Sequence, residues 1–340
     1  MATTKNPGKA LMGSFKELGM TAAQVRHFVP GWWDDEAAND EGGLLELQIL
    51  LARRLNVSFA TLQAPTPKPE FREAARRFKT VHPQGSAQLA VSAGVGHGFA
   101  HVLAAATSIP LRLRRLSPAH LRAALLKRKS SVTLDVLCTW LWEQGVPVVH
   151  ITNWPRQLRR PDAMCLRVGN RPVILIVRNE TAPARLTYLV AHELGHVMAG
   201  HLKVDNNEVL VDDTLPVDDQ GFANDEDEKI ADAYALELLG GDALRAASKS
   251  LATGYLDEMK LVLAAMGAAK DKGLDAGQVI LSWARLTGEW KTAGMGLRYL
   301  MTSGAARLVI NDAAKEFLDI EELSGDNQEH LARLTGIDFS

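Results

Sequence analysis

Two histidines four residues apart, His192 and His196, restrict this chain more than any other feature of its sequence. In an α-helix, residues four apart lie on one face, so both imidazoles can point at the same cation. Neutral imidazole is a good ligand for zinc. Glu193 lies about 100° further round the helix than the first histidine, where it can serve as a general base without being a ligand. The pattern therefore predicts a helix that carries a zinc site.

The segments around this helix indicate that it packs on a small sheet. Residues 172–177 have a β-branched apolar centre with polar residues on both sides, which is typical of a sheet strand. Residues 146–151 and 164–168 are further β-like runs. A helix is expected over about residues 184–201, and mainly helical patterns precede and follow this part of the chain. We therefore expect an α+β fold with helical flanking regions.

A catalytic zinc ion normally has three protein ligands and one open position, so a third ligand is needed. Glu228 is the best candidate, because residues 224–239 read as a helix whose acidic first turn complements the helix dipole. His201 competes with it, and so does a ligand that the sequence does not identify. In the three-histidine metzincin pattern the third histidine follows the second by six positions, whereas His201 follows by five. Glu226 and Asp227 read as solvated first-turn acids.

Further side chains are candidates for supporting roles around the zinc ion. Asp232 lies one turn after Glu228 and can accept a hydrogen bond from the free N–H of a histidine ligand. Tyr188, Tyr234 and His201 are candidates to contact the substrate or to stabilise an oxyanion. Each of these three can equally be a packing residue, so these assignments stay open.

Charge is unevenly distributed along the chain. Residues 1–130 contain 18 Lys and Arg against 9 Asp and Glu, and residues 131–340 contain 20 against 31. This distribution is consistent with an N-terminal region that binds nucleic acid, and equally with a basic lobe that docks on an acidic lobe of the same molecule. We favour docking, because the arginines lie on several separate segments.

Cysteine usage and hydropathy indicate the compartment. The two cysteines, Cys138 and Cys165, lie in apolar stretches, so we expect no disulfide framework and a reducing environment. The N-terminus does not read as a signal peptide. No stretch approaches the ~20 apolar residues of a membrane span. We expect a cytoplasmic protein that does not enter a membrane.

Composition divides the chain into four regions. We expect a helical N-terminal module over residues 1–64, with a degenerate likeness to a helix-turn-helix, and a helical basic linker region over 65–130. A metallopeptidase domain is expected over 131–240 and a helical C-terminal region over 241–340. A helix is predicted over about residues 70–107. Its glycine-rich run at 94–98 is expected to be a flexible junction rather than a phosphate loop, because no strand precedes it.

Two motifs together resemble the ImmA/IrrE family of metallopeptidases. The first is Leu189-Val-Ala-His-Glu-Leu-Gly-His196, and the second is Glu228-Lys-Ile-Ala-Asp-Ala-Tyr-Ala235, with Tyr234 in the position of an aromatic residue. The match runs over about residues 132–240. It implies a zincin-like, gluzincin-type core with one Zn²⁺ per chain, held by His192, His196 and Glu228, with Glu193 as catalytic base.

The resemblance also implies a function and a partner. Characterised relatives cleave a repressor that has a helix-turn-helix domain, so the expected reaction is hydrolysis of a specific protein of this kind. We do not expect autonomous DNA binding, because acidic residues 34–36 sit where a recognition helix should be basic. The alternative is a zinc-containing DNA-binding or sensor protein whose peptidase fold is a binding platform. Glu193 favours the enzyme, because a structural zinc site needs no general base.

Overall fold

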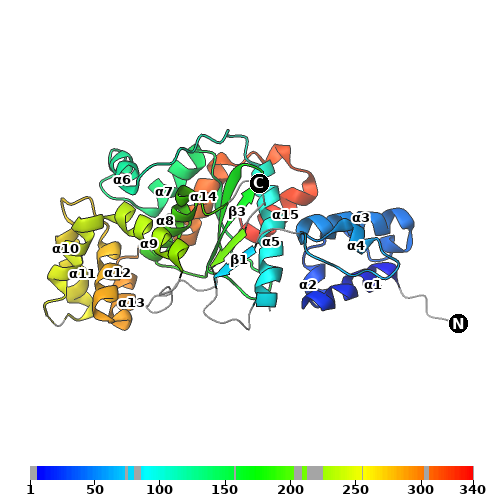
Figure 1. Cartoon of the computed structure of the whole chain (residues 1–340), viewed down its shortest axis with the longest axis horizontal. Coiled ribbons are helices and arrows are strands. Elements are labelled where there is room, and N and C mark those ends of the chain that lie inside the picture. Colours follow the sequence, from blue (N-terminus) through cyan, green and yellow to red (C-terminus); the bar gives the residue numbers. More distant parts are fainter. Residues whose placement is uncertain are drawn as a thin grey trace.

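The structure is a computed structural model that describes residues 6–72, 76–79, 86–156, 158–202, 209–212, 225–254, 256–301 and 306–339 (Figure 1). Its strands are β1 (Arg76–Lys79), β2 (Val148–His150), β3 (Ala163–Val168), β4 (Arg171–Ile176) and β5 (Val209–Asp212). Its α-helices are α1 (Pro7–Ser14), α2 (Ala22–Arg26), α3 (Glu41–Arg54), α4 (Phe59–Leu62), α5 (Ser86–Ala105), α6 (Pro118–Leu126), α7 (Leu134–Glu143), α8 (Pro183–Ala199), α9 (Glu226–Leu239), α10 (Gly241–Leu251), α11 (Glu258–Ala269), α12 (Ala276–Thr287), α13 (Trp290–Tyr299), α14 (Ala306–Phe317) and α15 (Gly325–Thr335). The predicted α+β class is confirmed.

The five described strands form one mixed sheet in the order β1-β5-β3-β4-β2. Strand β3 runs antiparallel to both of its neighbours, whereas β2 lies parallel to β4 and β1 lies parallel to β5. A turn at Gly169, with φ of +60°, joins β3 to β4. The three predicted strands are β2, β3 and β4. Strands β1 and β5 were not predicted, and they widen the sheet beyond the small one expected.

Helices cover both faces of this sheet. Helix α8 contacts β3 and β4 from one side, and α7 and α14 pack beside α8 and contact β2. Helix α5 contacts β3 and β4 from the other side (Figure 1). Because both faces are covered, the side chains of β4 from Val173 to Ile176 are completely buried. The site-bearing helix α8 is therefore held between the sheet and further helices.

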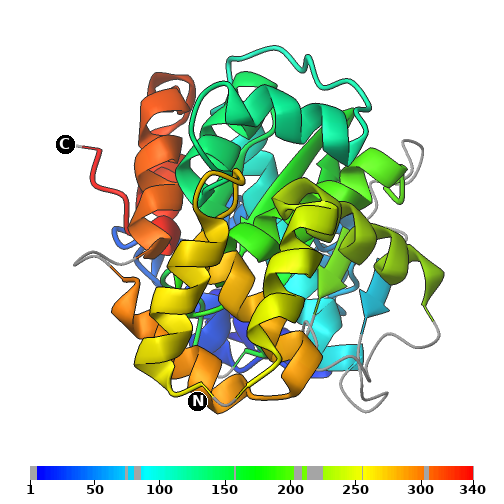
Figure 2. The same ribbon diagram turned by 90° about the vertical axis from the view of Figure 1, so that its left-hand side faces the viewer.

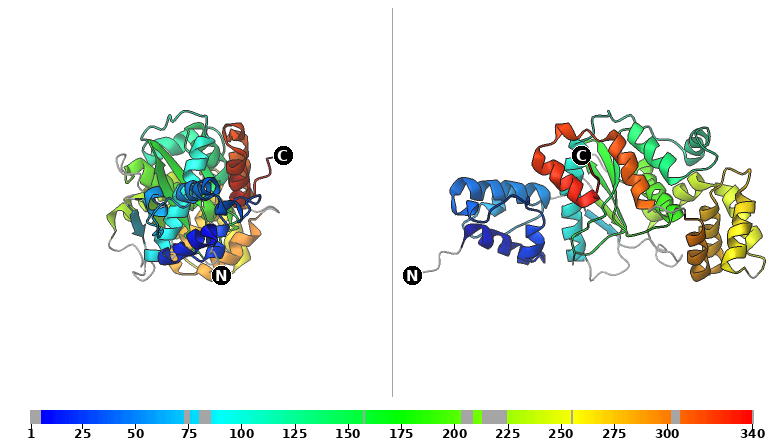
Figure 3. Two further views of the ribbon diagram at one scale, coloured as in Figure 1. Left: turned by 90° about the vertical axis from the view of Figure 1, so that its right-hand side faces the viewer. Right: turned by 180° about the vertical axis from the view of Figure 1, so that it is seen from behind.

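The N-terminal helices pack against α5 and lie beside α15, as Figure 3 shows from behind. Arg54, at the end of α3, joins these parts: its guanidinium donates to the main-chain oxygens of Phe28, at 2.7 Å, and Asp326, at 2.8 Å. His330 of α15 is buried between the rings of Phe28 and Phe99. The N-terminal helical region and α15 thus share a buried contact.

The predicted C-terminal region contributes to two places. Helices α10 to α13 form a lobe that faces the viewer in Figure 2 and contacts α8 and α9. Helix α14 instead packs on α7 and β2, where the Asn311 side chain accepts from the His150 N–H at 2.8 Å and donates to the His150 carbonyl at 2.9 Å. The layered core thus includes α5, β1 and α14, which lie outside the predicted range 131–240.

The prediction of one helix over residues 70–107 with a flexible glycine junction was wrong. Residues 76–79 form strand β1, and α5 runs without interruption through the glycine-rich run. The glycines permit close packing: an added Cβ would lie 2.7 Å from the Met164 sulfur at Gly96, and 2.2 Å from the Arg54 carbonyl oxygen at Gly98. Within the described residues, no helix combines the length and the apolar character that crossing a membrane requires.

Candidate metal centre

Helix α8 carries the two histidines and is buried along most of its length. Pro183 starts it, where the missing N–H costs no hydrogen bond, and Gly200 ends it with φ of +78°. The side chains of His192, Glu193 and His196 are all 0% exposed. Buried polar groups are tolerated only where they are paired or bind a metal. Three buried polar side chains within five residues therefore indicate a paired or metal-binding cluster.

Helix α9 brings the third candidate ligand. The Asp225 carboxylate caps the helix by accepting from the Asp227 N–H at 3.1 Å. Glu228 of the first turn is buried, whereas Glu226 pairs with Lys229 at the surface. Gly195 permits the close approach of α9 to α8, because a Cβ at that position would lie 2.7 Å from the Ala231 carbonyl oxygen.

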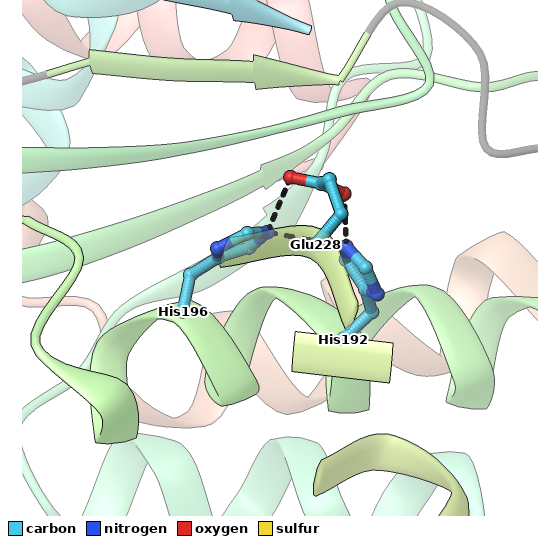
Figure 4. Close-up of side chains that lie close together, drawn as sticks. All are labelled: His192, His196 and Glu228. Atoms are coloured by element: carbon cyan, nitrogen blue, oxygen red, sulfur yellow. Dashed lines mark hydrogen bonds and ion pairs between the residues drawn. The ribbon is translucent and has the colours of Figure 1, made fainter. Parts of the chain in front are cut away.

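The donor atoms of His192, His196 and Glu228 converge on one another (Figure 4). His192 Nε2 lies 3.1 Å from His196 Nε2 and 3.1 Å from Glu228 Oε2, and His196 Nε2 lies 3.3 Å from Glu228 Oε1. Tetrahedral zinc with bonds of about 2.1 Å holds its ligand atoms about 3.4 Å apart. The observed separations therefore come close to those of a tetrahedral metal centre.

The electrostatics of the triad also suit a cation. Burial by itself raises the pKa of Glu228, but hydrogen bonds from His192 and His196 outweigh burial and hold that pKa well below its usual range. Two imidazole nitrogens that face each other at 3.1 Å need a proton or a metal ion between them. The three residues can thus hold a metal ion, as the sequence predicts.

His201 lies behind His196 rather than among the converging donor atoms. The two Nδ1 atoms are 2.8 Å apart, so they share a hydrogen bond, and His201 Nε2 lies 3.4 Å from Asp227 Oδ1. The prediction that Asp227 is only a solvated acid was therefore wrong, because the start of α9 turns its carboxylate toward His201. No sequence signal indicates this pair, since it depends on how α8 and α9 pack.

Asp232 has a different partner from the one expected. Within the described residues it accepts a hydrogen bond from the Tyr188 hydroxyl rather than from a histidine ring, and Arg285 lies 3.7 Å from its carboxylate. Tyr188 is one turn before His192, and the two ring centroids are 6.1 Å apart. The Arg285 guanidinium covers the Tyr188 ring at 4.2 Å. Asp232 therefore fixes a tyrosine that packs beside a candidate ligand. Arg285, which contacts both Asp232 and Tyr188, belongs to the surroundings of the site and was missed by the sequence reasoning.

Tyr234 is directed away from the triad. Its hydroxyl donates to the Leu116 carbonyl at 3.1 Å, and burial raises its pKa. Six positions after Glu228, it lies about 240° round the helix from that residue, so α9 turns it toward the segment before α6. This contact favours the packing alternative, in which Tyr234 ties α9 to that segment.

A pocket of about 50 Å³ lies between α8, α9 and the C-terminal lobe, and Tyr188, one turn before His192, is part of its lining. Tyr188 and Leu236 contribute to it from the two site helices, and Arg285 and Trp290 from α12 and α13. Its lining is apolar apart from arginine, tyrosine, glutamine and serine side chains. The pocket is large enough for several water molecules or one side chain.

Comparison of the chain with protein-family models, with curated proteins and with solved structures gives no match. The functional interpretation therefore depends on the residues and their geometry.

Proposed function

We propose that the chain is a zinc-dependent endopeptidase with a zincin-like core, which hydrolyses a specific protein. The observation that carries this proposal is the convergence of three buried donors, His192, His196 and Glu228, at separations close to those of tetrahedral zinc. Two imidazoles and a carboxylate are a frequent ligand set of catalytic zinc. A set of three leaves one coordination position for the substrate or for water.

The chain's own residues have distinct tasks in the proposed reaction. Zinc, when bound, supplies the Lewis acidity that activates water and polarises a peptide carbonyl. The carboxylate of Glu193 takes a proton from the attacking water and later delivers it to the leaving amine nitrogen. Its complete burial supports this role, because excluding bulk water strengthens the electrostatic interactions that assist proton transfer.

The substrate proposed is a repressor with a helix-turn-helix domain, as the resemblance to the ImmA/IrrE family implies. An extended peptide can add to an open sheet edge. Strand β4 is internal and α14 covers β2 at His150, which favours β1 as that edge. The pocket lined by Tyr188 and Leu236 is proposed to receive a substrate side chain. The two cysteines, Cys138 and Cys165, are both buried, which fits the proposed cytoplasmic location.

Cleavage of the repressor encoded beside this protein tests the proposal. We expect the zinc-loaded chain to cut it, and Glu193→Gln to keep the zinc while cleavage falls about 10²–10⁴-fold. Glu237→Gln, on the exposed side of α9, is the matched control and should cut normally. A chain that holds zinc, cleaves no neighbouring regulator and binds DNA tightly would instead be the zinc-containing regulator considered above.

A further inference from the structure

A second candidate site lies in a cleft of about 670 Å³ that none of the three candidate metal ligands lines. It is formed by α2, by the segment after β2 and by the last turn of α15, three segments that the fold brings together. His27, Arg156, Arg160 and Arg333 contribute to its lining, and no carboxylate of the described residues does. A cleft with this lining has a positive electrostatic potential that attracts anions.

The walls of the cleft are held in place by hydrogen bonds between distant segments. Asn153 donates through its main-chain N–H to the Leu334 carbonyl at 3.0 Å and through its side chain to the Arg333 carbonyl at 2.8 Å. Arg333 in turn donates to the Val29 carbonyl at 3.3 Å. Asn153 and Arg333 are therefore held in place before any ligand arrives, which reduces the cost of binding.

Two arginines at this cleft lack the carboxylate partners that other arginines of the chain have. Arg178 pairs with Asp162 at 2.6 Å. Arg156 and Arg160 are exposed, and across the described part of the chain no carboxylate pairs with either. Arg333 meets Glu329 at 3.8 Å, but its guanidinium is only partly neutralised by an acid at that distance.

His27 adds an independent observation. Its Nε2 is buried and has no hydrogen-bond partner in the described residues. Burial lowers the pKa of this imidazole, and the positive charge of Arg333 lowers it further. A buried polar atom without a partner is uncommon and calls for a ligand or water.

We propose that this cleft binds a small phosphate-bearing anion. Guanidinium groups bind phosphate oxygens through pairs of parallel N–H donors. Three arginines with a single distant carboxylate favour a ligand that carries more than one negative charge. The volume lies within the range of small-molecule sites. A nucleic acid is less suitable, because the cations gather in one cleft rather than along a stripe. This inference does not depend on the proposed peptidase activity.

Calorimetric titration of the full chain with inorganic pyrophosphate and with ATP tests the site. We expect saturable binding of at least one of them that weakens with added salt. Arg156→Ala/Arg160→Ala should reduce the affinity about tenfold or more, because charge-assisted hydrogen bonds are lost, and the paired lysine variant should recover part of it. Both arginines are exposed, so thermal unfolding should confirm that each variant is folded.

The matched control is Arg112→Ala/Arg114→Ala, which removes two exposed arginines from another loop. It should leave the affinity within about twofold of wild type if the cleft is the site. Equal weakening by both pairs would mean general charge attraction and would overturn the proposal. So would binding of duplex DNA or of a polyglutamate peptide that neither pyrophosphate nor ATP displaces, and so would the absence of binding of both phosphate compounds.

Discussion

At the scale of single residues, the hydrogen bond between His196 and His201 determines which nitrogen of His196 can face a metal ion. If His196 Nε2 binds the metal, its Nδ1 must carry the proton and donate it to His201 Nδ1, 2.8 Å away. The proton of His201 then lies on Nε2, toward Asp227. A series of hydrogen bonds of this kind orients a metal ligand.

We therefore expect His201→Ala to weaken zinc binding about 10–100-fold without unfolding the chain. His201→Asn, whose amide oxygen can accept from the His196 N–H, should restore part of the affinity. Competition with a chromophoric chelator measures both. His120→Ala, at an exposed histidine, is the control. Unchanged zinc affinity in His201→Ala would show that His201 only fills space.

The residues of the triad could be predicted because their chemistry is encoded in local spacing. His192, His196 and Glu228 lie on two helices with clear periodicity, so two sequence patterns were enough. Asp227 could not be separated from its neighbour Glu226, because both are acids in one first turn. Which of them faces inward depends on how α9 packs against α8, and the sequence pattern does not contain that information.

At the scale of secondary-structure elements, the contact between α8 and α9 determines whether the site can form. Gly195→Ala should drive the two helices apart, because the new Cβ would lie 2.7 Å from the Ala231 carbonyl oxygen and 2.9 Å from the Ala231 Cα. Overpacking of this kind costs about 1–3 kcal/mol. We expect a lower free energy of unfolding in urea together with weaker zinc binding, since Glu228 moves with α9.

Gly267→Ala is the matched control for this prediction. Gly267 lies within α11 with open space around its Cα, so the substitution should stabilise the chain by about 0.5–1 kcal/mol and leave zinc binding unchanged. If Gly195→Ala behaves in the same way as Gly267→Ala, the close packing of α8 and α9 does not matter for the site.

Strands β2, β3 and β4 could be predicted, and strands β1 and β5 could not. Strand β4 is apolar from Pro172 to Ile176 because this part is buried on both faces, and this leaves a clear pattern. Strands β1 and β5 are four residues each and pair with one another from distant parts of the chain. Such short strands form through non-local pairing, which local composition does not reveal.

At the scale of the whole molecule, His330 links the stability of the fold to pH. It lies between the N-terminal helices and α5, where burial first, and then Arg54, Arg333 and His27, lower its pKa well below 6.5. The folded chain therefore excludes a proton that the unfolded chain binds. The resulting stabilisation is complete above about pH 6.5 and is lost as the pH falls below it, by up to about 1.4 kcal/mol per pH unit.

Urea unfolding of wild type and His330→Gln between pH 7.5 and pH 5 measures this effect. Wild type should lose stability more steeply than the variant as the pH decreases, because glutamine binds no proton in this range. The difference between the two slopes isolates His330 from the other histidines, which both proteins share. Parallel slopes would mean that His330 takes up its proton without disturbing the contact between α15 and the N-terminal helical region.

The proposed function depends on one zinc ion held by two histidines of α8 and one glutamate of α9. Zinc content and affinity of Glu228→Gln, compared with Glu226→Gln two residues away, test it most directly. Glu226 is at the surface, so its variant should bind one zinc ion per chain as wild type does. Glu228→Gln should lose affinity by more than about 100-fold, since it removes a ligand rather than a residue behind one. Equal zinc binding by the two variants, or no zinc in wild type, would contradict the claim.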